Sequence, residues 1–205
     1  MNKIITILIT CFISTGLMGQ TKSAKIIEDL KTAYNGESSA SAKYAKYAEV
    51  AKKEGYLNIA RMFEATSKAE SFHAANHLAV MKKLGGSVSG PVLEPVKPGT
   101  TAENLADGIK GETWEYETMY PPMIKAAETA ELYDAVTTFR YARDTEKRHK
   151  VIYEKALTAL KAGQEKSVSA VWYVCPTCGN TYNSADLAVS CEFCGTLRPR
   201  FLIFQ

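Results

Sequence analysis

Two stretches of the sequence, Glu70-Ser-Phe-His73 and Glu146-Lys-Arg-His149, carry most of the information about the fold. Residues three apart on a helix share a face, so each stretch places a carboxylate beside an imidazole. Both stretches interrupt the apolar face of a segment whose hydrophobic residues recur at helical spacing. A buried carboxylate is costly unless a cation compensates its charge. The two stretches therefore predict two helices whose buried faces meet around a bound metal.

The surrounding sequence is helical in character from Lys22 to about Gly163, because it is rich in Ala, Glu, Lys and Leu and poor in breakers. The expected breaks are Gly55, Gly85-Gly86, a Pro-containing connection up to Thr101, a turn at residues 130–132, and Gly163. Pro121-Pro122 should kink or end the third helix, since neither residue has a backbone donor. Four helices with short outer turns and a long middle connection predict an all-α, ferritin-like four-helix bundle over residues 20–163.

Acidic residues occur at similar depths on all four predicted helices. Glu37 on the first helix and Glu112 and Glu115 on the third lie about 15–18 residues from their turns, as do the glutamates of the two Glu-x-x-His stretches. One glutamate from each of two helices and one Glu-x-x-His from each of the other two is the pattern of di-iron carboxylate proteins. Carboxylates with imidazoles favour iron or manganese over a thiophilic metal. The alternative is an ordinary solvated Glu–His pair on each helix. His77 has no glutamate three residues earlier, and we interpret it as a hydrogen-bonded core residue.

A second, small domain follows the linker at residues 164–170. Residues 171–205, here called the cysteine module, contain two Cys-x-x-Cys-Gly pairs with twelve residues between them: Cys175, Cys178, Cys191 and Cys194. This spacing can present four thiolates to one tetrahedral ion, and about 35 residues are too few to fold without such support. The spacing suits a structural zinc and a redox iron equally. A disulfide role is less favoured, because both halves have the form of a metal-binding turn.

Composition and the N-terminus limit where the protein acts. The chain of 205 residues is 46% hydrophobic and 23% charged, which is typical of a soluble globular protein. A net charge of +3 without a basic cluster does not favour a nucleic-acid partner. The short basic start and the uncharged run Ile4–Met18 predict a signal peptide over residues 1–19, hence an exported, periplasmic protein whose mature chain is not inserted in a membrane. A retained N-terminus would instead indicate a cytoplasmic protein.

The motifs together resemble the rubrerythrin family over essentially the whole mature chain. The resemblance rests on Gly36-Glu37-Ser38, on the two Glu-x-x-His stretches, and on Gly111-Glu112-Thr-Trp-Glu115-Tyr-Glu-Thr-Met-Tyr120-Pro121. It implies that two irons are bound by Glu37, Glu70, His73, Glu112, Glu115, Glu146 and His149. It also implies that one iron exchanges Glu115 for His73 on reduction, and that Tyr44 and Tyr120 hydrogen-bond the ligands. The cysteine module looks like the family's rubredoxin-like domain, which favours Fe(Cys)4 over zinc.

The activity that the resemblance implies is reduction of hydrogen peroxide to water, as protection against oxidative stress. Electrons would come from an unidentified redox protein through the cysteine module, which in the family is supplied by the neighbouring subunit of a homodimer. Family members usually lack an export signal, so the predicted signal peptide is a departure from the family. If this protein is exported, a cytosolic reductase cannot be its electron donor. The alternatives are a ferroxidase or iron-storage protein, and a non-enzymatic metal-binding protein with a structural zinc ribbon.

Overall fold

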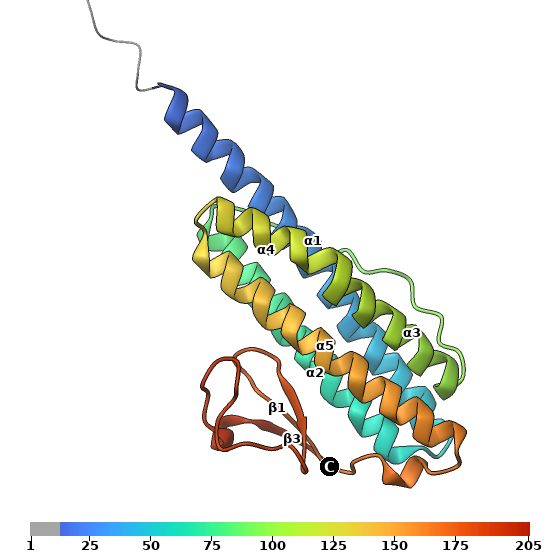
Figure 1. The fold of residues 1–205 in the computed structure, drawn as a ribbon. Coiled ribbons are helices and arrows are strands. Elements are labelled where there is room, and N and C mark those ends of the chain that lie inside the picture. Colours follow the sequence, from blue (N-terminus) through green and yellow to red (C-terminus); the bar gives the residue numbers. More distant parts are fainter. Residues whose placement is uncertain (1–12) are drawn as a thin grey trace, which may run out of the picture.

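The computed structural model describes residues 13–205, with side chains from Ser23 on. Its helices are α1 (Ile13–Lys53), α2 (Leu57–Lys83), α3 (Thr101–Trp114), α4 (Tyr120–Thr129) and α5 (Tyr133–Lys161). Helices α3 and α4 continue one another, so the five segments form four rods that lie side by side (Figure 1). The predicted ferritin-like bundle with a small C-terminal domain is confirmed.

The connections follow the breakers in the sequence. Gly55 adopts a φ of +88° between α1 and α2, a conformation that side chains with a Cβ rarely adopt. After α2 the chain runs back along the bundle without regular structure (Figure 1). Thr100 then caps α3, because its side chain accepts from the Glu103 amide while the Glu103 carboxylate accepts from the Thr100 amide.

The third rod differs from the expected kink at Pro121-Pro122. The helix does not end there; a π-helical turn at Glu115–Met119 leads directly into α4, whose first turn holds both prolines. In a regular α-helix, Glu112 and Tyr120 would lie about 80° apart around the axis. The extra residue of the wide turn brings Tyr120 back to the face of Glu112, and both side chains are fully buried.

The apolar core is divided into two clusters. One contains Phe63, Leu105 and Tyr153, and the other contains Leu30 and Phe139. The buried carboxylates and imidazoles contact residues of both clusters, so the polar centre of the bundle lies between two apolar ends.

The cysteine module forms a three-stranded antiparallel sheet of order β2-β1-β3. Its strands are β1 (Trp172–Val174), β2 (Thr181–Asn183) and β3 (Leu202–Phe204). The module packs against α2 and α5 of its own chain (Figure 1). Trp172 and Val174 belong to the same apolar cluster as Phe63 of the bundle, and Asn76 Nδ2 donates to the Thr177 carbonyl at 2.9 Å. The module is therefore docked by a shared core rather than only tethered by its linker.

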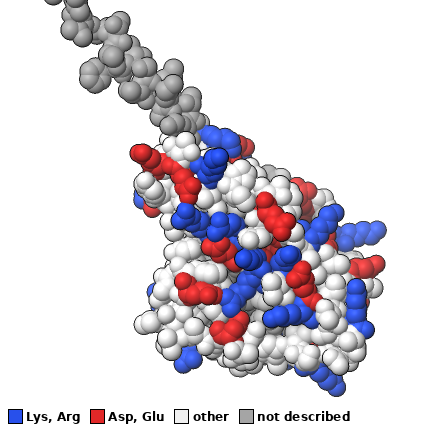
Figure 2. All heavy atoms as spheres, viewed as in Figure 1, with Lys and Arg blue, Asp and Glu red and all other residues white. Residues whose placement is uncertain are grey.

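The predicted signal peptide lies mostly outside the described residues. Helix α1 begins at Ile13, within the run assigned to that peptide, and export stays a prediction. Within the described part of the chain, no helix combines the length and apolar character needed to cross a bilayer. Basic and acidic side chains are interspersed on the face drawn in Figure 2.

Candidate metal centres

The centre of the bundle holds two overlapping groups of candidate ligands. The first group is Glu37, Glu70, His73 and Glu146, and the second is Glu70, Glu112, Glu146 and His149. Within each group, one ligand atom per residue lies within 4.8 Å of all the others. Glu70 and Glu146 belong to both groups. The arrangement fits two metal ions: Glu37 and His73 would help to hold one, Glu112 and His149 the other, and Glu70 and Glu146 could contribute to both.

Each histidine points its Nδ1 atom at these carboxylates. His73 Nδ1 lies 2.8 Å from Glu70 and 3.1 Å from Glu146. His149 Nδ1 lies 2.9 Å from Glu70 and 3.2 Å from Glu146. Both rings are at most 1% exposed. The Nε2 atom of each ring points the other way, and His73 Nε2 donates to the Cys178 carbonyl of the cysteine module at 3.0 Å.

Each of the two unshared glutamates accepts a hydrogen bond from a buried tyrosine. Tyr44 donates to Glu112 at 2.5 Å, and Tyr120 donates to Glu37. A phenol held in this way fixes the carboxylate's rotamer and leaves its other oxygen for a metal. These are the contacts that the family resemblance implies for Tyr44 and Tyr120.

His77 lies behind this first layer. Its Nε2 is 3.1 Å from the Tyr120 hydroxyl, and its Nδ1 is 3.0 Å from Thr138 Oγ1. Since the single proton of Tyr120 is donated to Glu37, His77 Nε2 must donate to the Tyr120 oxygen. Burial lowers the pKa of His77 to about 3, which keeps the ring neutral. His77 is therefore a hydrogen-bonded core residue and belongs to neither ligand group.

The chemistry of the buried groups fits a cationic cofactor. Of nine buried side-chain atoms without a hydrogen-bond partner in the described residues, six belong to the two groups: Glu37 Oε2, Glu70 Oε1, Glu112 Oε2, both Glu146 oxygens and His149 Nδ1. Burial raises the pKa of Glu37 to about 7, and burial together with the charge of Glu70 holds the pKa of Glu112 and Glu146 well above the usual range. These carboxylates are stable in the protein only when protonated or bound to cations.

Glu115 is the one candidate ligand that the structure leaves out of both groups. Its side chain starts the π-helical turn and is 9% exposed, whereas Glu37 and Glu112 have no exposed surface. Burial and the charges of Glu37 and Glu70 raise its pKa well above the ordinary value, so it lies within their electrostatic reach. The structure therefore has His73 inside a ligand group and Glu115 outside.

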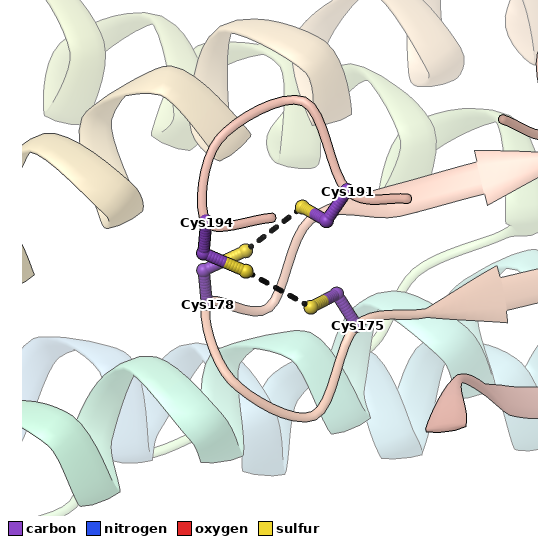
Figure 3. A group of neighbouring side chains, drawn as sticks. All are labelled: Cys175, Cys178, Cys191 and Cys194. Atoms are coloured by element: carbon purple, nitrogen blue, oxygen red, sulfur yellow. Dashed lines mark hydrogen bonds between the residues drawn. The ribbon is translucent and has the colours of Figure 1, made fainter. Parts of the chain in front are cut away.

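The four cysteines of the module converge on one point. They extend from two loops that face each other (Figure 3), and the Sγ atoms of Cys175 and Cys194 are 3.5 Å apart, those of Cys178 and Cys191 3.4 Å. All four are free thiols, so no disulfide joins them, and they form one candidate metal group. The Tyr182 hydroxyl contacts Cys191 Sγ at 3.4 Å, a bond that stabilises a thiolate.

Sequence patterns missed the contacts between the two centres. The cysteine module reaches the bundle's histidines through the Cys178 carbonyl and through Thr181 Oγ1, which lies 2.9 Å from His149 Nε2. A backbone carbonyl carries no signal in a sequence, and a lone threonine after a metal-binding turn carries almost none. The resemblance also implied that the module comes from a neighbouring subunit, whereas in this structure the chain's own module occupies the position beside its own histidines.

Comparison with known proteins agrees with this arrangement. The family model of rubrerythrin matches residues 28–157. Rubrerythrin-2 of Clostridium acetobutylicum is 32% identical over 190 residues, which cover 89% of this chain and 98% of that protein. Nigerythrin of Nitratidesulfovibrio vulgaris is 31% identical over 88% of this chain and 86% of its own length.

Among solved structures, nigerythrin in its fully reduced, all-ferrous state superimposes with a TM-score of 0.78 at 31% identity over 87% of this chain and 86% of that one. The bacterioferritin of Desulfovibrio desulfuricans has a TM-score of 0.67 at 20% identity over 73% of this chain and 88% of that one, which shows a shared fold alone. The chain therefore belongs to the rubrerythrin family, with the ligands of a di-iron site in its bundle and of a rubredoxin-like iron site in its cysteine module.

Proposed function

We propose that this protein reduces hydrogen peroxide to water at the di-iron site and receives its electrons through an iron bound by the cysteine module. The observation that carries the proposal is the contact between the two centres. His73 bonds the Cys178 carbonyl through Nε2 and faces the buried carboxylates through Nδ1. One imidazole therefore connects a cysteine ligand of one centre to the ligand group of the other, which is a short covalent and hydrogen-bonded route for single electrons.

When bound, two ferrous ions supply the two electrons that, with two protons, convert hydrogen peroxide into two molecules of water. The protein's part is to hold the ligands and to admit a small substrate. Tyr44 and Tyr120 fix the two unshared glutamates, so those carboxylates do not need to reorganise during turnover. Glu115, which starts the π-helical turn, is 9% exposed, more than any other candidate ligand of the bundle, so peroxide would enter on its side.

The exchange of Glu115 for His73 is part of this proposal. His73 lies in a ligand group and Glu115 does not, which is the arrangement expected of the reduced site. A π-helical turn is a wide and readily adjusted piece of helix, so a side chain that starts it can move without unfolding the rod. Glu115 would replace His73 as a ligand after oxidation.

The experiment that tests the function replaces iron by zinc in the cysteine module only. Zinc keeps the tetrahedral geometry and the docked module but transfers no electrons. The prereduced, zinc-substituted protein should consume peroxide once in a stopped-flow experiment, at the rate of the all-iron protein. Its steady-state turnover with a protein electron donor should be lost, because nothing returns electrons to the buried site. Equal steady-state rates for the two forms would show that the cysteines serve structure alone.

Two measurements separate the alternative functions. An iron-storage protein needs a large hollow assembly, so the particle mass in solution distinguishes it from the homodimer or higher oligomer that we propose. A ferroxidase would oxidise its ferrous iron faster with dioxygen than with hydrogen peroxide. Comparing the two oxidation rates at equal oxidant concentration tests this.

We also propose that the protein is exported, on the basis of the uncharged run Ile4–Met18. N-terminal sequencing of the native protein should begin near residue 20, and the protein should be found in the periplasmic fraction. A native chain that begins at Met1 in the cytoplasmic fraction would contradict export.

A further inference from the structure

The Nε2 atoms of His73 and His149, on the side of each ring away from the carboxylates, both contact the same segment of the cysteine module. His73 Nε2 donates to the carbonyl of Cys178 at 3.0 Å, and His149 Nε2 lies 2.9 Å from Thr181 Oγ1. Cys178 and Thr181 are three residues apart, at the end of the first Cys-x-x-Cys-Gly turn. His149 and Thr181 have no exposed surface, so water cannot substitute for this contact.

The direction of the second hydrogen bond follows from the proton count. Thr181 Oγ1 donates its one proton to the Gly179 carbonyl at 3.1 Å, so its oxygen accepts from His149. His149 Nε2 must then carry a proton. In the neutral ring this leaves the lone pair on Nδ1, the atom that lies 2.9 Å from Glu70 and 3.2 Å from Glu146.

We propose that Thr181 is a positioning residue for His149, and that the docked cysteine module thereby presets the second imidazole for metal binding. The partner of the outer nitrogen decides which nitrogen of a histidine binds a metal and how the ring is oriented. The module therefore contributes to the affinity of the bundle for its metals as well as to electron transfer. Linkage makes the effect reciprocal, so metal in the bundle also strengthens docking of the module. The inference depends on the metal site and not on peroxide as the substrate.

The fit between the module and the histidines is tight. A Cβ on Gly179 would lie 2.3 Å from His73 Nε2, which is far inside van der Waals contact. Gly195 occupies the equivalent place in the second Cys-x-x-Cys-Gly turn, and a Cβ there would meet nothing within 4 Å. The two glycines have nearly the same φ, +79° and +74°, so an added methyl strains both backbones alike.

The first experiment compares Thr181→Val with Thr181→Ser. Valine keeps the shape of threonine and removes the hydroxyl, while serine keeps the hydroxyl. Ferrous iron is titrated anaerobically into protein that retains the cysteine-bound iron, in competition with a chromogenic chelator. Thr181→Val should weaken binding to the bundle by about 10- to 100-fold, and Thr181→Ser should restore most of it. Thr177→Val is the control, because Thr177 Oγ1 bonds only Thr196 within the module.

A second readout needs no iron in the bundle. In the protein without bundle metal, nitrogen NMR should show a hydrogen-bonded His149 Nε2–H in the wild type, and that signal should shift and exchange faster with solvent in Thr181→Val. The visible spectrum of the cysteine-bound iron should be the same in both. Wild-type ferrous affinity, or an unchanged His149 Nε2–H signal, in Thr181→Val would overturn the proposal.

Alanine substitutions at Gly179 and Gly195 test, independently of Thr181, whether contact with the cysteine module supports metal binding in the bundle. Gly179→Ala should weaken ferrous binding in the bundle by at least tenfold relative to Gly195→Ala, because only the first collides with a histidine. Comparison at equal content of cysteine-bound iron removes the common backbone strain from the result. Equal ferrous affinities for the two variants would show that the module's contact does not support the metal site.

Discussion

Removing the Tyr120 hydroxyl tests whether the bundle's metal ligands are held by their buried partners. Tyr120 has no exposed surface, donates to Glu37, and accepts from His77 Nε2 at 3.1 Å. Tyr120→Phe keeps the ring and its packing against Phe139. It leaves one carboxylate oxygen and one N–H without partners in the interior.

The size of the effect follows from these two groups. A buried polar atom that loses its partner costs about 1–3 kcal/mol, so the variant should lose about 2–6 kcal/mol of unfolding free energy before metal is added. That is a large share of the roughly 5–15 kcal/mol that stabilises a typical domain. Ferrous affinity should also fall, by about 10- to 100-fold, because Glu37 is no longer held in its ligand rotamer.

The assay combines urea unfolding of the metal-free protein with anaerobic ferrous titration. Tyr47→Phe is the matched control: Tyr47 is also buried and donates to a carboxylate, Asp107, at 2.8 Å. Asp107 is half exposed and also pairs with Lys43, so water and the lysine replace the lost bond. The control should lose about 1 kcal/mol or less and bind iron normally. Equal losses for Tyr120→Phe and Tyr47→Phe would show that the Tyr120 hydroxyl does not hold Glu37 as a metal ligand.

Three further predictions concern the exchange ligand, the pH dependence and the docking. Glu115→Ala should fold and bind ferrous iron, since Glu115 is in neither ligand group, but its steady-state peroxide turnover should fall; unchanged turnover would contradict its proposed role. Burial raises the pKa of Glu37 from 4.5 to about 7, so the folded metal-free protein binds a proton more tightly than the unfolded chain. The unfolding free energy of the metal-free protein should therefore fall as the pH rises from 4.5 to 7. Urea denaturation at several pH values in that range measures it, and an increase with pH would contradict the prediction. Trp172→Ala truncates a side chain that is 3% exposed in the shared core, at a cost of about 3–5 kcal/mol, and should release the module. Release would loosen the linker, whose Val168 carbonyl accepts from Asn58 Nδ2 at 2.8 Å, so limited proteolysis at residues 164–170 should become faster. An unchanged cleavage rate would argue against docking through Trp172.

The fold could be predicted because its signals are local. Glycines, prolines and the helical repeat of apolar residues define the helices, and the breaks at Gly55 and Gly163 fall where α1 and α5 end. The convergence of Glu37, Glu70 and Glu146 could also be anticipated, since carboxylates buried at equal depth in a bundle are stabilised by a shared cation. Equal depth alone could not separate Glu115 from the carboxylates that form the two groups.

Two features could not be predicted from the sequence: the rotation of the third rod after its π-helical turn, and the way the cysteine module packs on the bundle. The π-helical turn changes the rotation of Tyr120 relative to Glu112, and Pro121-Pro122 indicated an irregularity without its geometry. The contact of Thr181 with His149 arises from the packing of the cysteine module on the bundle. No motif in either domain indicates which surface of the other domain it contacts. The same holds for the position of the module against its own bundle.

The metal content of both sites is tested most directly by a Mössbauer spectrum of iron-57-enriched, natively folded protein, with iron and zinc counted in the same sample. The two ligand groups and the four cysteines predict three irons per chain: two with oxygen and nitrogen ligands in the bundle, and one with four thiolate ligands in the cysteine module. Zinc in place of the thiolate-bound iron, or fewer than two irons with oxygen and nitrogen ligands after anaerobic reconstitution, would contradict it.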